Sequence, residues 1–517
     1  MGNFAIIDLF KKLYRSKEQL RIYKKSIVKK NRCIYFLIRE GIDRKLVVIY
    51  PLDKQDSLRE FIFEKQDFFT IKNKKFGYIV CKCNSENAST LRRIFPFTRP
   101  RTIGLTPAIG LGDRLGLATP GHIRAIRGLK ILPVLAQQSI REIERTKRMP
   151  QEVLDDVSWA VFQEGYRRDF AADADHLKSE EDINRTFQAG FTMYTIDPSD
   201  YIDAEADNYA PNVLIEKFDS LPWDELKIRK KRFLQRYLNK ELILRLPNGE
   251  IIELRFSEES LMRNTVKFSS AILFVYRAYR QLRELFGRKR FDFEVSIDET
   301  EKHTTALEHF FIVLELKRLG VRFNSLALKF VGRFEKGRDY IGNLKEFEED
   351  FIKHVLISKS LGPYKLSIHS GSDKFSIYPI IGRIAPNIIH LKTSGTSYLE
   401  SLRVIARRDP NLFKEIVKYS LDSFEVDKRS YNVSADLRLM PNPEMVSNEK
   451  LEKTFLDGNV GRQVLHVTFG SVLTAKDENG NWLFRERIKR VLLENEEEFY
   501  EIIAAHIKKH VEMCFPT

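Results

Sequence analysis

From residue 101 onward the chain alternates short apolar runs with longer stretches that have the period of amphipathic helices. This alternation is typical of βαβ units, in which a helix follows each strand and neighbouring strands run parallel. Eight runs have the pattern of strands: Thr102–Thr106, Phe170–Asp175, Phe191–Ile196, Phe291–Ile297, Ser325–Val331, Lys365–His369, Ile388–Lys392 and Val464–Gly470. Eight such units predict an α/β fold, a (β/α)8 TIM-type barrel, with a doubly wound open sheet as the alternative.

The residues before this alternation have another pattern and predict a separate domain. Residues 1–95 indicate a small α/β module, because the runs over 32–49 and 76–83 have the character of strands. The sequence FPFTRP at 95–100 then breaks regular structure and marks a boundary. Residues 96–517 are therefore predicted to form a barrel-like catalytic domain.

Two intervals in the barrel domain are too long for simple crossovers, and we expect insertions at about 200–290 and at 422–461. The first contains Leu242–Phe256, in which an Asn-Gly pair separates two alternating runs, a pattern typical of a β-hairpin. The clearest predicted helices are Thr304–Leu319, Leu344–Leu361, Thr396–Arg408 and, near the C-terminal end, Trp482–Glu512.

The net charge of +15 belongs almost entirely to the N-terminal module, since residues 1–100 hold 23 Lys/Arg and 10 Asp/Glu. A basic module of this kind binds a polyanion, faces an acidic neighbour, or is simply solvated. No zinc-finger, RNP or helix-turn-helix signature accompanies the charge, so nucleic acid is not the expected partner.

Membrane and disulfide-built classes are excluded by other features. No apolar run reaches the roughly 18 residues needed to span a bilayer, and the first residues lack the features of a secretory signal. The four cysteines are too few for a disulfide framework and are expected to be reduced: Cys33, Cys81, Cys83 and Cys514. We therefore expect a cytoplasmic protein.

Active sites of (β/α)8 barrels gather at the C-terminal ends of the strands, so ionisable residues there are the candidates. They include Asp173–His176, Asp298-Glu299, His369, His390 and His466. Of the ten histidines in the chain, four lie on or at the end of a predicted strand, which predicts a site for Zn²⁺, Mn²⁺, Co²⁺ or Ni²⁺. The competing interpretation is that each histidine is a hydrogen-bonded core residue and that Glu299 caps the following helix.

Cationic residues in the same region are suited to a carboxylate or phosphate on a small substrate. Lys329 and Lys392 lie within predicted strands, where an unpaired charge is costly, and Arg114 belongs to the glycine-containing segment Gly110–Gly116. Such a loop offers backbone N–H groups to an anion or a polyol. It is not a GxGxxG motif, so a nucleotide cofactor is not predicted.

Several ordered motifs together resemble those of the tagaturonate/fructuronate epimerase family. They are Gly110–Gly116 with Thr119–His122, Asp173–His176, Ser296–Glu301, Phe334–Tyr340, Ser367–Phe375, His390–Glu400 and Arg462–Leu473. The match runs from about residue 92 to the C-terminus. It implies an isomerase, a metal-dependent epimerase that inverts C4 of a ketose acid and interconverts D-tagaturonate and D-fructuronate. Relatives also act on tagatose and fructose.

The resemblance also implies roles for individual residues. Asp175 is expected to accept a proton and Glu299 to donate one from the opposing side. The expected metal ligands are His176, His369 and His390. Independently of the resemblance, the residues expected to bind substrate, a sugar acid or ketose, are Lys329, Asp373, Lys392 and Arg114. A homo-oligomer is left open.

The chemistry itself restricts the mechanism. The hydrogen on C4 is not adjacent to the C2 ketone, so simple enolisation does not make it acidic. Retro-aldol cleavage of the C3–C4 bond, assisted by a cation and by Asp175 as base, is favoured over direct removal of the C4 proton. Two alternative functions remain. A metal-dependent aldolase or ketose isomerase is the enzymatic alternative. A polyanion- or RNA-binding protein acting through the basic module is the alternative from another class.

Overall fold

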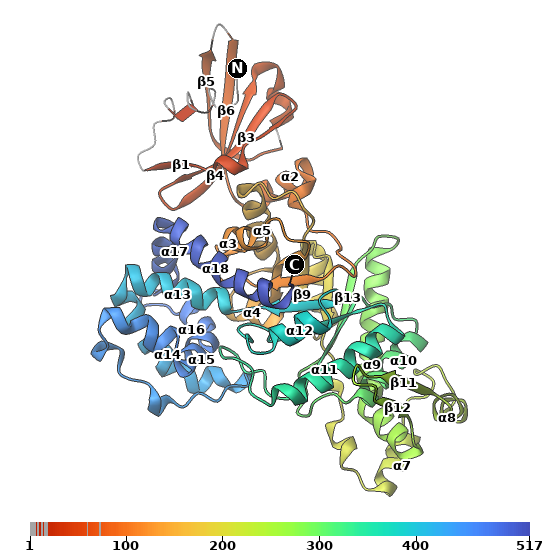
Figure 1. The fold of residues 1–517 in the computed structure, drawn as a ribbon. Coiled ribbons are helices and arrows are strands. Elements are labelled where there is room, and N and C mark those ends of the chain that lie inside the picture. Colours follow the sequence, from red (N-terminus) through yellow and green to blue (C-terminus); the bar gives the residue numbers. More distant parts are fainter. Residues whose placement is uncertain are drawn as a thin grey trace.

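The computed structural model describes residues 19–58, 60–71 and 74–516, together with Ile7, Phe10, Lys11 and Tyr14. The other residues at the start of the predicted 1–95 module, and Thr517 at the end of the predicted barrel domain, lie outside this description. Three parts are visible in Figure 1: an N-terminal sheet, a central barrel and helical lobes on either side of the barrel.

The centre of the molecule is a closed barrel of eight parallel strands in chain order, with the last strand pairing with the first. The strands are β7 (Ala108–Leu111), β8 (Leu132–Ser139), β9 (Ala171–Leu177), β10 (Met193–Ile196), β13 (Asp292–Ile297), β14 (Ser325–Leu328), β15 (Lys365–Ile368) and β16 (Ile389–Thr393). The predicted (β/α)8 barrel is confirmed, and the open-sheet alternative is wrong.

Two of the eight predicted strands are wrong, and two strands of the barrel, β7 and β8, were not predicted. The first strand is β7 and not Thr102–Thr106, a segment that contains a left-handed Gly104 and ends just before Pro107. The second unpredicted strand is β8, in which a proline near the start and a polar end conceal the strand pattern. Val464–Gly470 is helical: it spans the end of α15 (Asn459–Val467) and the start of α16 (Phe469–Thr474). Val464 and Val467 pack together against Phe424, as residues three apart on one helix do.

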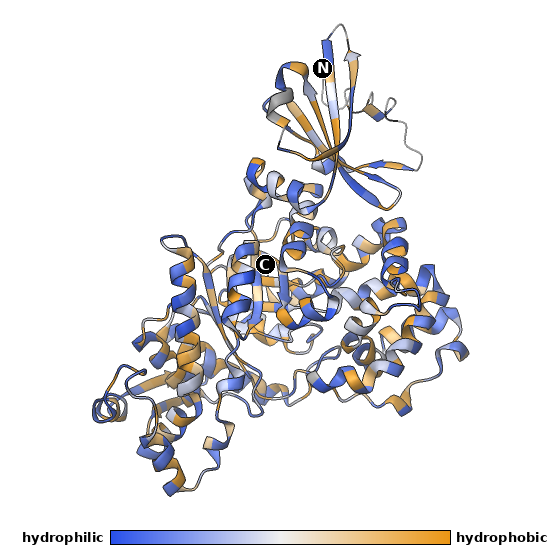
Figure 2. Cartoon of the chain, turned by 180° about the vertical axis from the view of Figure 1, so that it is seen from behind, coloured by the Kyte–Doolittle hydropathy of each residue, from blue (hydrophilic) through white to orange (hydrophobic). Residues whose placement is uncertain are grey.

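Helices follow the strands and surround the barrel, and each shows both hydrophobic and hydrophilic residues in Figure 2. They are α3 (Thr119–Ile126), α4 (Ile140–Thr146), α5 (Pro150–Gln163), α6 (Glu180–Ala189), α9 (Glu258–Phe286), α10 (Ala306–Arg318), α11 (Leu344–Leu361), α12 (Tyr378–Ile384), α13 (Thr396–Arg408), α14 (Pro410–Asp427), α17 (Arg485–Glu494) and α18 (Glu496–Cys514). The helix predicted at Thr304–Leu319 begins two residues later than expected, at Ala306, because Thr305 and Glu308 form a capping box.

The interval between β10 and β13 forms the lobe at the lower right of Figure 1. It contains α7 (Pro211–Asp219), α8 (Lys230–Leu238) and the hairpin of β11 (Glu241–Arg245) and β12 (Ile251–Arg255). The predicted Asn-Gly hairpin is confirmed, and Gly249 has the positive φ of +87° that such a turn requires.

The N-terminal sheet is antiparallel, with the order β1-β3-β4-β6-β5 and β2 paired to β3. Its strands are β1 (Leu20–Ile22), β2 (Val28–Lys30), β3 (Cys33–Glu40), β4 (Asp43–Pro51), β5 (Phe63–Ile71) and β6 (Lys74–Lys82), followed by α2 (Ser85–Ile94). One face of the sheet shares a hydrophobic cluster with Trp159 and Phe162 of α5, so the sheet is packed onto the barrel domain.

Acidic side chains of the barrel domain meet part of the positive charge of this sheet. Arg21 lies 2.8 Å from Glu496 and also pairs with Glu497, and Lys25 lies 2.8 Å from Glu164. Some of the basic surplus in the first hundred residues is therefore neutralised within the same chain. Among the described residues, none of the helices has the length and apolar character needed to cross a bilayer.

Candidate active site

The C-terminal ends of the barrel strands enclose a pocket. Its lining is polar and includes Asp175, His176, Asp298, Glu299, His369 and Lys392. The strand alternation explains this: on β13, Glu294 and Ser296 point into the barrel while Phe293 and Val295 face the surrounding helices.

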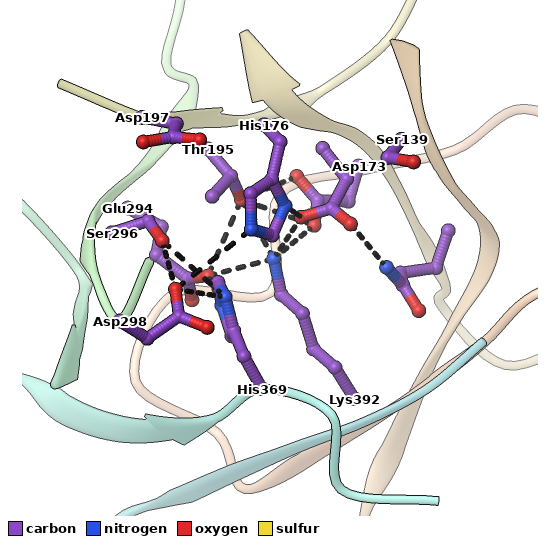
Figure 3. A network of polar contacts seen from close by, with 12 residues as sticks. Ser139, Asp173, His176, Thr195, Asp197, Glu294, Ser296, Asp298, His369 and Lys392 are labelled. Atoms are coloured by element: carbon purple, nitrogen blue, oxygen red, sulfur yellow. Dashed lines mark hydrogen bonds and ion pairs between the residues drawn. The ribbon is translucent and has the colours of Figure 1, made fainter. Parts of the chain in front are cut away.

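Three side chains at the barrel mouth form a set of donors that fits a divalent cation. One ligand atom from each of His176, Asp298 and His369 lies within 4.8 Å of the other two. Nδ1 of His369 is 2.9 Å from Oδ1 of Asp298, and Nε2 of His176 is 3.8 Å from the same oxygen (Figure 3). Two imidazoles and a carboxylate are a common donor set for Zn²⁺ and Mn²⁺.

Backbone conformation at His176 explains how two successive residues of β9 both face the pocket. His176 has a φ of +55°, in the left-handed region that side chains other than glycine rarely adopt. The turn breaks the alternation of the strand, so Asp175 and His176 both line the pocket. Strain of this kind is typical of functional positions.

His390, the third expected ligand, does not belong to this group of three. It lies deeper in the barrel, fully buried on β16, with Nδ1 3.1 Å from Oε2 of Glu294. Burial lowers the pKa of His390 to about 4, so the ring is neutral. Asp298 takes the third position beside His176 and His369 instead.

Lys392 is the centre of an ion-pair network below the pocket. Its Nζ lies 2.7 Å from a carboxylate oxygen of each of Asp173, Asp175 and Glu294 (Figure 3). Burial by itself lowers the pKa of Lys392, but the three carboxylates outweigh it and hold the pKa well above its usual value. The ammonium group thus offsets negative charge that would be costly to bury alone.

The two carboxylates with expected proton-transfer roles lie on either side of His176. Asp175 Oδ1 is 2.9 Å from His176 Nδ1, while Glu299 Oε1 is 3.8 Å from Nε2. Gln137 donates a hydrogen bond of 2.8 Å to the other oxygen of Asp175, and Arg141 lies 3.1 Å from Glu299. Burial raises the pKa of Asp175, but the charges of His176 and Lys392 hold that pKa well below its usual range. Asp175 is therefore ionised.

The glycine-containing segment after β7 does not offer its amides to a ligand. Asp113 accepts hydrogen bonds from the backbone N–H groups of Leu115, Gly116, Ala118 and Thr119, so these donors are already satisfied. The prediction that this loop binds an anion or a polyol through its backbone N–H groups is therefore wrong for these four amides. Arg114 does line the pocket, but its guanidinium is bound by Glu142 at 2.7 Å and lies over the ring of Phe469.

The remaining two residues expected to bind substrate, Lys329 and Asp373, are not among the side chains that line this pocket. Nζ of Lys329 donates to the carbonyl of Thr300. Asp373 is bound by Arg462 and by His506 of α18, both at 2.7 Å. Asp373 therefore ties the loop after β15 to the C-terminal helix.

Four residues that the sequence analysis left without a role complete the site: Gln137, Glu294, Asp298 and Lys336. Two of them, Glu294 and Asp298, could have been found from the side-chain alternation of β13. This alternation places Glu294, Ser296 and Asp298 on the same face of the strand and Glu299 on the opposite face. Gln137 had no such signal, since its strand was not recognised. Lys336 lies within the family motif Phe334–Tyr340, but its position in a loop gave no periodic signal for its role.

Comparisons with known proteins agree with this architecture. A family model described as tagaturonate epimerase matches residues 23–514. A curated tagaturonate/fructuronate epimerase of Thermotoga maritima is 42% identical over 492 residues, which cover 95% of this chain and 96% of the relative. The native crystal structure of fructuronate-tagaturonate epimerase UxaE from Cohnella laeviribosi is 36% identical and superposes with a TM-score of 0.88 over 99% of both chains. A glycerol complex of the same enzyme is 35% identical, with the same TM-score and coverage. The chain therefore belongs to the tagaturonate epimerase family, a family of isomerases.

Proposed function

We propose that this protein interconverts D-tagaturonate and D-fructuronate by inverting C4, with a divalent cation held by His176, Asp298 and His369. The observation that carries the proposal is the position of this donor set, at the mouth of a barrel of this family and directly beside two carboxylates. When bound, the cation would act as a Lewis acid that stabilises negative charge on the substrate oxygens near the ketone.

The protein's own groups would carry the protons. Asp175 is held in place by Gln137, His176 and Lys392, and it would accept the proton of the C4 hydroxyl. Glu299 lies by the other ring nitrogen of His176, and 32% of its side chain is exposed. Partial burial raises the pKa of Glu299, but the charges of His176 and Arg141 outweigh it and lower the pKa, so Glu299 would take up a proton from water before it delivers that proton from the other side, and Asp175 would return its proton to water.

Loss of the C4 hydroxyl proton allows the C3–C4 bond to break. C4 becomes an aldehyde, and the electron pair of the bond passes to C3 and forms an enediolate over C2 and C3. Rotation of that aldehyde and re-formation of the bond, with a proton from Glu299, inverts the centre. Direct removal of the C4 hydrogen is the competing route. Substrate deuterated at C4 separates them: retention of the label in the product supports cleavage, whereas exchange of the label into water excludes it.

The experiment that tests the function is metal analysis of the purified protein, followed by incubation with D-tagaturonate and separation of the sugars by chromatography. We expect a divalent cation and D-fructuronate as the product. Three-carbon fragments as the net product would indicate an aldolase, and an aldose would indicate a ketose isomerase. Parallel incubations with tagatose and fructose test whether the proposed activity extends to neutral ketoses.

A further inference from the structure

Lys336 places a positive charge at the pocket without a carboxylate in ion-pair contact with it. Its Nζ donates a hydrogen bond of 2.8 Å to the hydroxyl of Ser370, and both residues line the pocket. Ser370 directly follows His369, and both of these residues line the same pocket as Lys336.

The other cationic side chains of the pocket are all paired. Arg114 is bound by Glu142 at 2.7 Å, Arg141 lies 3.1 Å from Glu299, and Lys392 contacts three carboxylates at 2.7 Å. In the described part of the chain, no carboxylate lies within 4.0 Å of Nζ of Lys336. A shielded ammonium group with only a hydroxyl partner is unfavourable unless an anion joins it.

The loop that carries Lys336 is held rigidly on both sides. Nζ of the fully buried Lys374 donates to the carbonyl of Glu335 at 2.9 Å and to that of Arg338. Arg462 donates to the carbonyl of Gly337 at 3.1 Å. Backbone atoms immediately before and after Lys336 are therefore fixed by cationic side chains from other elements.

The carboxylate of Glu335 adds to this support. It is 1% exposed and accepts hydrogen bonds from Gln463 at 2.9 Å and from Ser434 at 2.6 Å. Such a preorganised position is what a residue that recognises one substrate group requires, because little ordering is left to occur on binding.

We propose that Lys336 binds the carboxylate of the sugar acid and is the residue that distinguishes a hexuronate from a neutral hexose. This inference rests on the proposed function for the identity of the substrate. The ammonium group supplies a charge-assisted hydrogen bond to a carboxylate oxygen, and a neutral CH₂OH group at the same position forms only an ordinary one. Lys336 is a specificity-determining residue here and transfers no proton.

Steady-state kinetics with D-tagaturonate provide the first test. We expect Lys336→Met and Lys336→Gln to raise KM about 10- to 100-fold, as expected for loss of a charged hydrogen bond, and to change kcat much less. Lys336→Arg should recover most of the lost affinity. Lys345→Met serves as the matched control, because it removes a lysine that is 85% exposed in the first turn of α11.

Calorimetric binding of D-galacturonate and D-galactose provides the second test, because the two sugars differ only in the carboxylate at C6. The wild-type holoenzyme should prefer the uronate, and Lys336→Met should abolish that preference while leaving affinity for D-galactose within about twofold. An intact preference in Lys336→Met, or none in the wild-type protein, would overturn the inference.

The two proposals fail in different ways. If the wild-type protein does not epimerise D-tagaturonate, the proposed function is wrong, and the calorimetric comparison still decides whether Lys336 recognises a carboxylate. If it does epimerise D-tagaturonate but KM is unchanged in both neutral variants, only the role of Lys336 is wrong. Thermal unfolding of each variant shows whether a change in KM reflects damage to the fold.

Discussion

The imidazole rings of His176 and His369 lie 4.9 Å apart, measured between ring centroids, although His176 is the second-last residue of β9 and His369 follows β15. The barrel is what joins them, because parallel strands bring their C-terminal ends to one face. Asp298, which follows β13, approaches both rings (Figure 3).

Removal of a ligand from this group should remove the metal. We expect His176→Ala, His369→Ala and Asp298→Asn to lose bound cation and turnover while the fold survives, since these side chains lie at the barrel mouth. Metal content by mass spectrometry and circular dichroism check this. His390→Gln is the informative comparison: it should retain the cation, because His390 lies outside the group of three. Loss of metal from His390→Gln but not from Asp298→Asn would reverse the assignment.

Lys392→Met should destabilise the protein severely. The substitution leaves Asp173, Asp175 and Glu294 buried together without their shared counter-charge. Breaking a buried ion pair from one side costs about 3–5 kcal/mol, which urea unfolding at neutral pH should detect. Adding Asp173→Asn to Lys392→Met should recover part of this stability, since it removes one of the unpaired charges. No recovery would show that packing of the lysine stem dominates.

Asp175→Asn should abolish proton acceptance while largely preserving the pocket. The amide has nearly the shape of the carboxylate but is not a base, so we expect kcat to fall about 10²- to 10⁴-fold. Metal content should remain close to that of the wild-type protein, since Asp175 is not one of the three grouped donors. Gln137→Ala removes one hydrogen bond to Asp175 and should cost less. Equal losses in the two variants would point to positioning and not to base catalysis.

Stability should fall in acid because of His122 in α3. Burial lowers the pKa of His122 to about 4, whereas an unfolded chain titrates near 6.5. Between these values the unfolded state binds more protons, so the stabilising contribution is complete above pH 6.5 and is lost as the pH falls toward 4. Its upper limit is about 3 kcal/mol.

Urea unfolding of His122→Gln at several pH values between 4 and 7.5 checks this contribution. The variant should depend less on pH over that range than the wild-type protein. His303→Gln, at an exposed position, is the control and should keep the wild-type dependence. Parallel pH curves for His122→Gln and the wild-type protein would contradict the prediction.

Much of the architecture followed from the sequence alone. Alternating apolar runs predict parallel strands, and strand ends rich in histidine and carboxylate predict where the pocket lies, because side-chain period and barrel geometry are local and general rules. Six of the eight strands, the hairpin around Gly249 and the neighbourhood of His176 and His369 were accessible in this way.

Which charges meet was decided only by the tertiary structure. Lys392 forms ion pairs with three carboxylates of β9 and β13, whereas Lys336 forms a hydrogen bond with a hydroxyl group. The sequence does not distinguish these two lysines. His390 fits the sequence pattern of a ligand as well as Asp298 does, and only depth in the barrel separates them. Pairing depends on register and strand order, which join residues far apart in the chain and leave no local pattern.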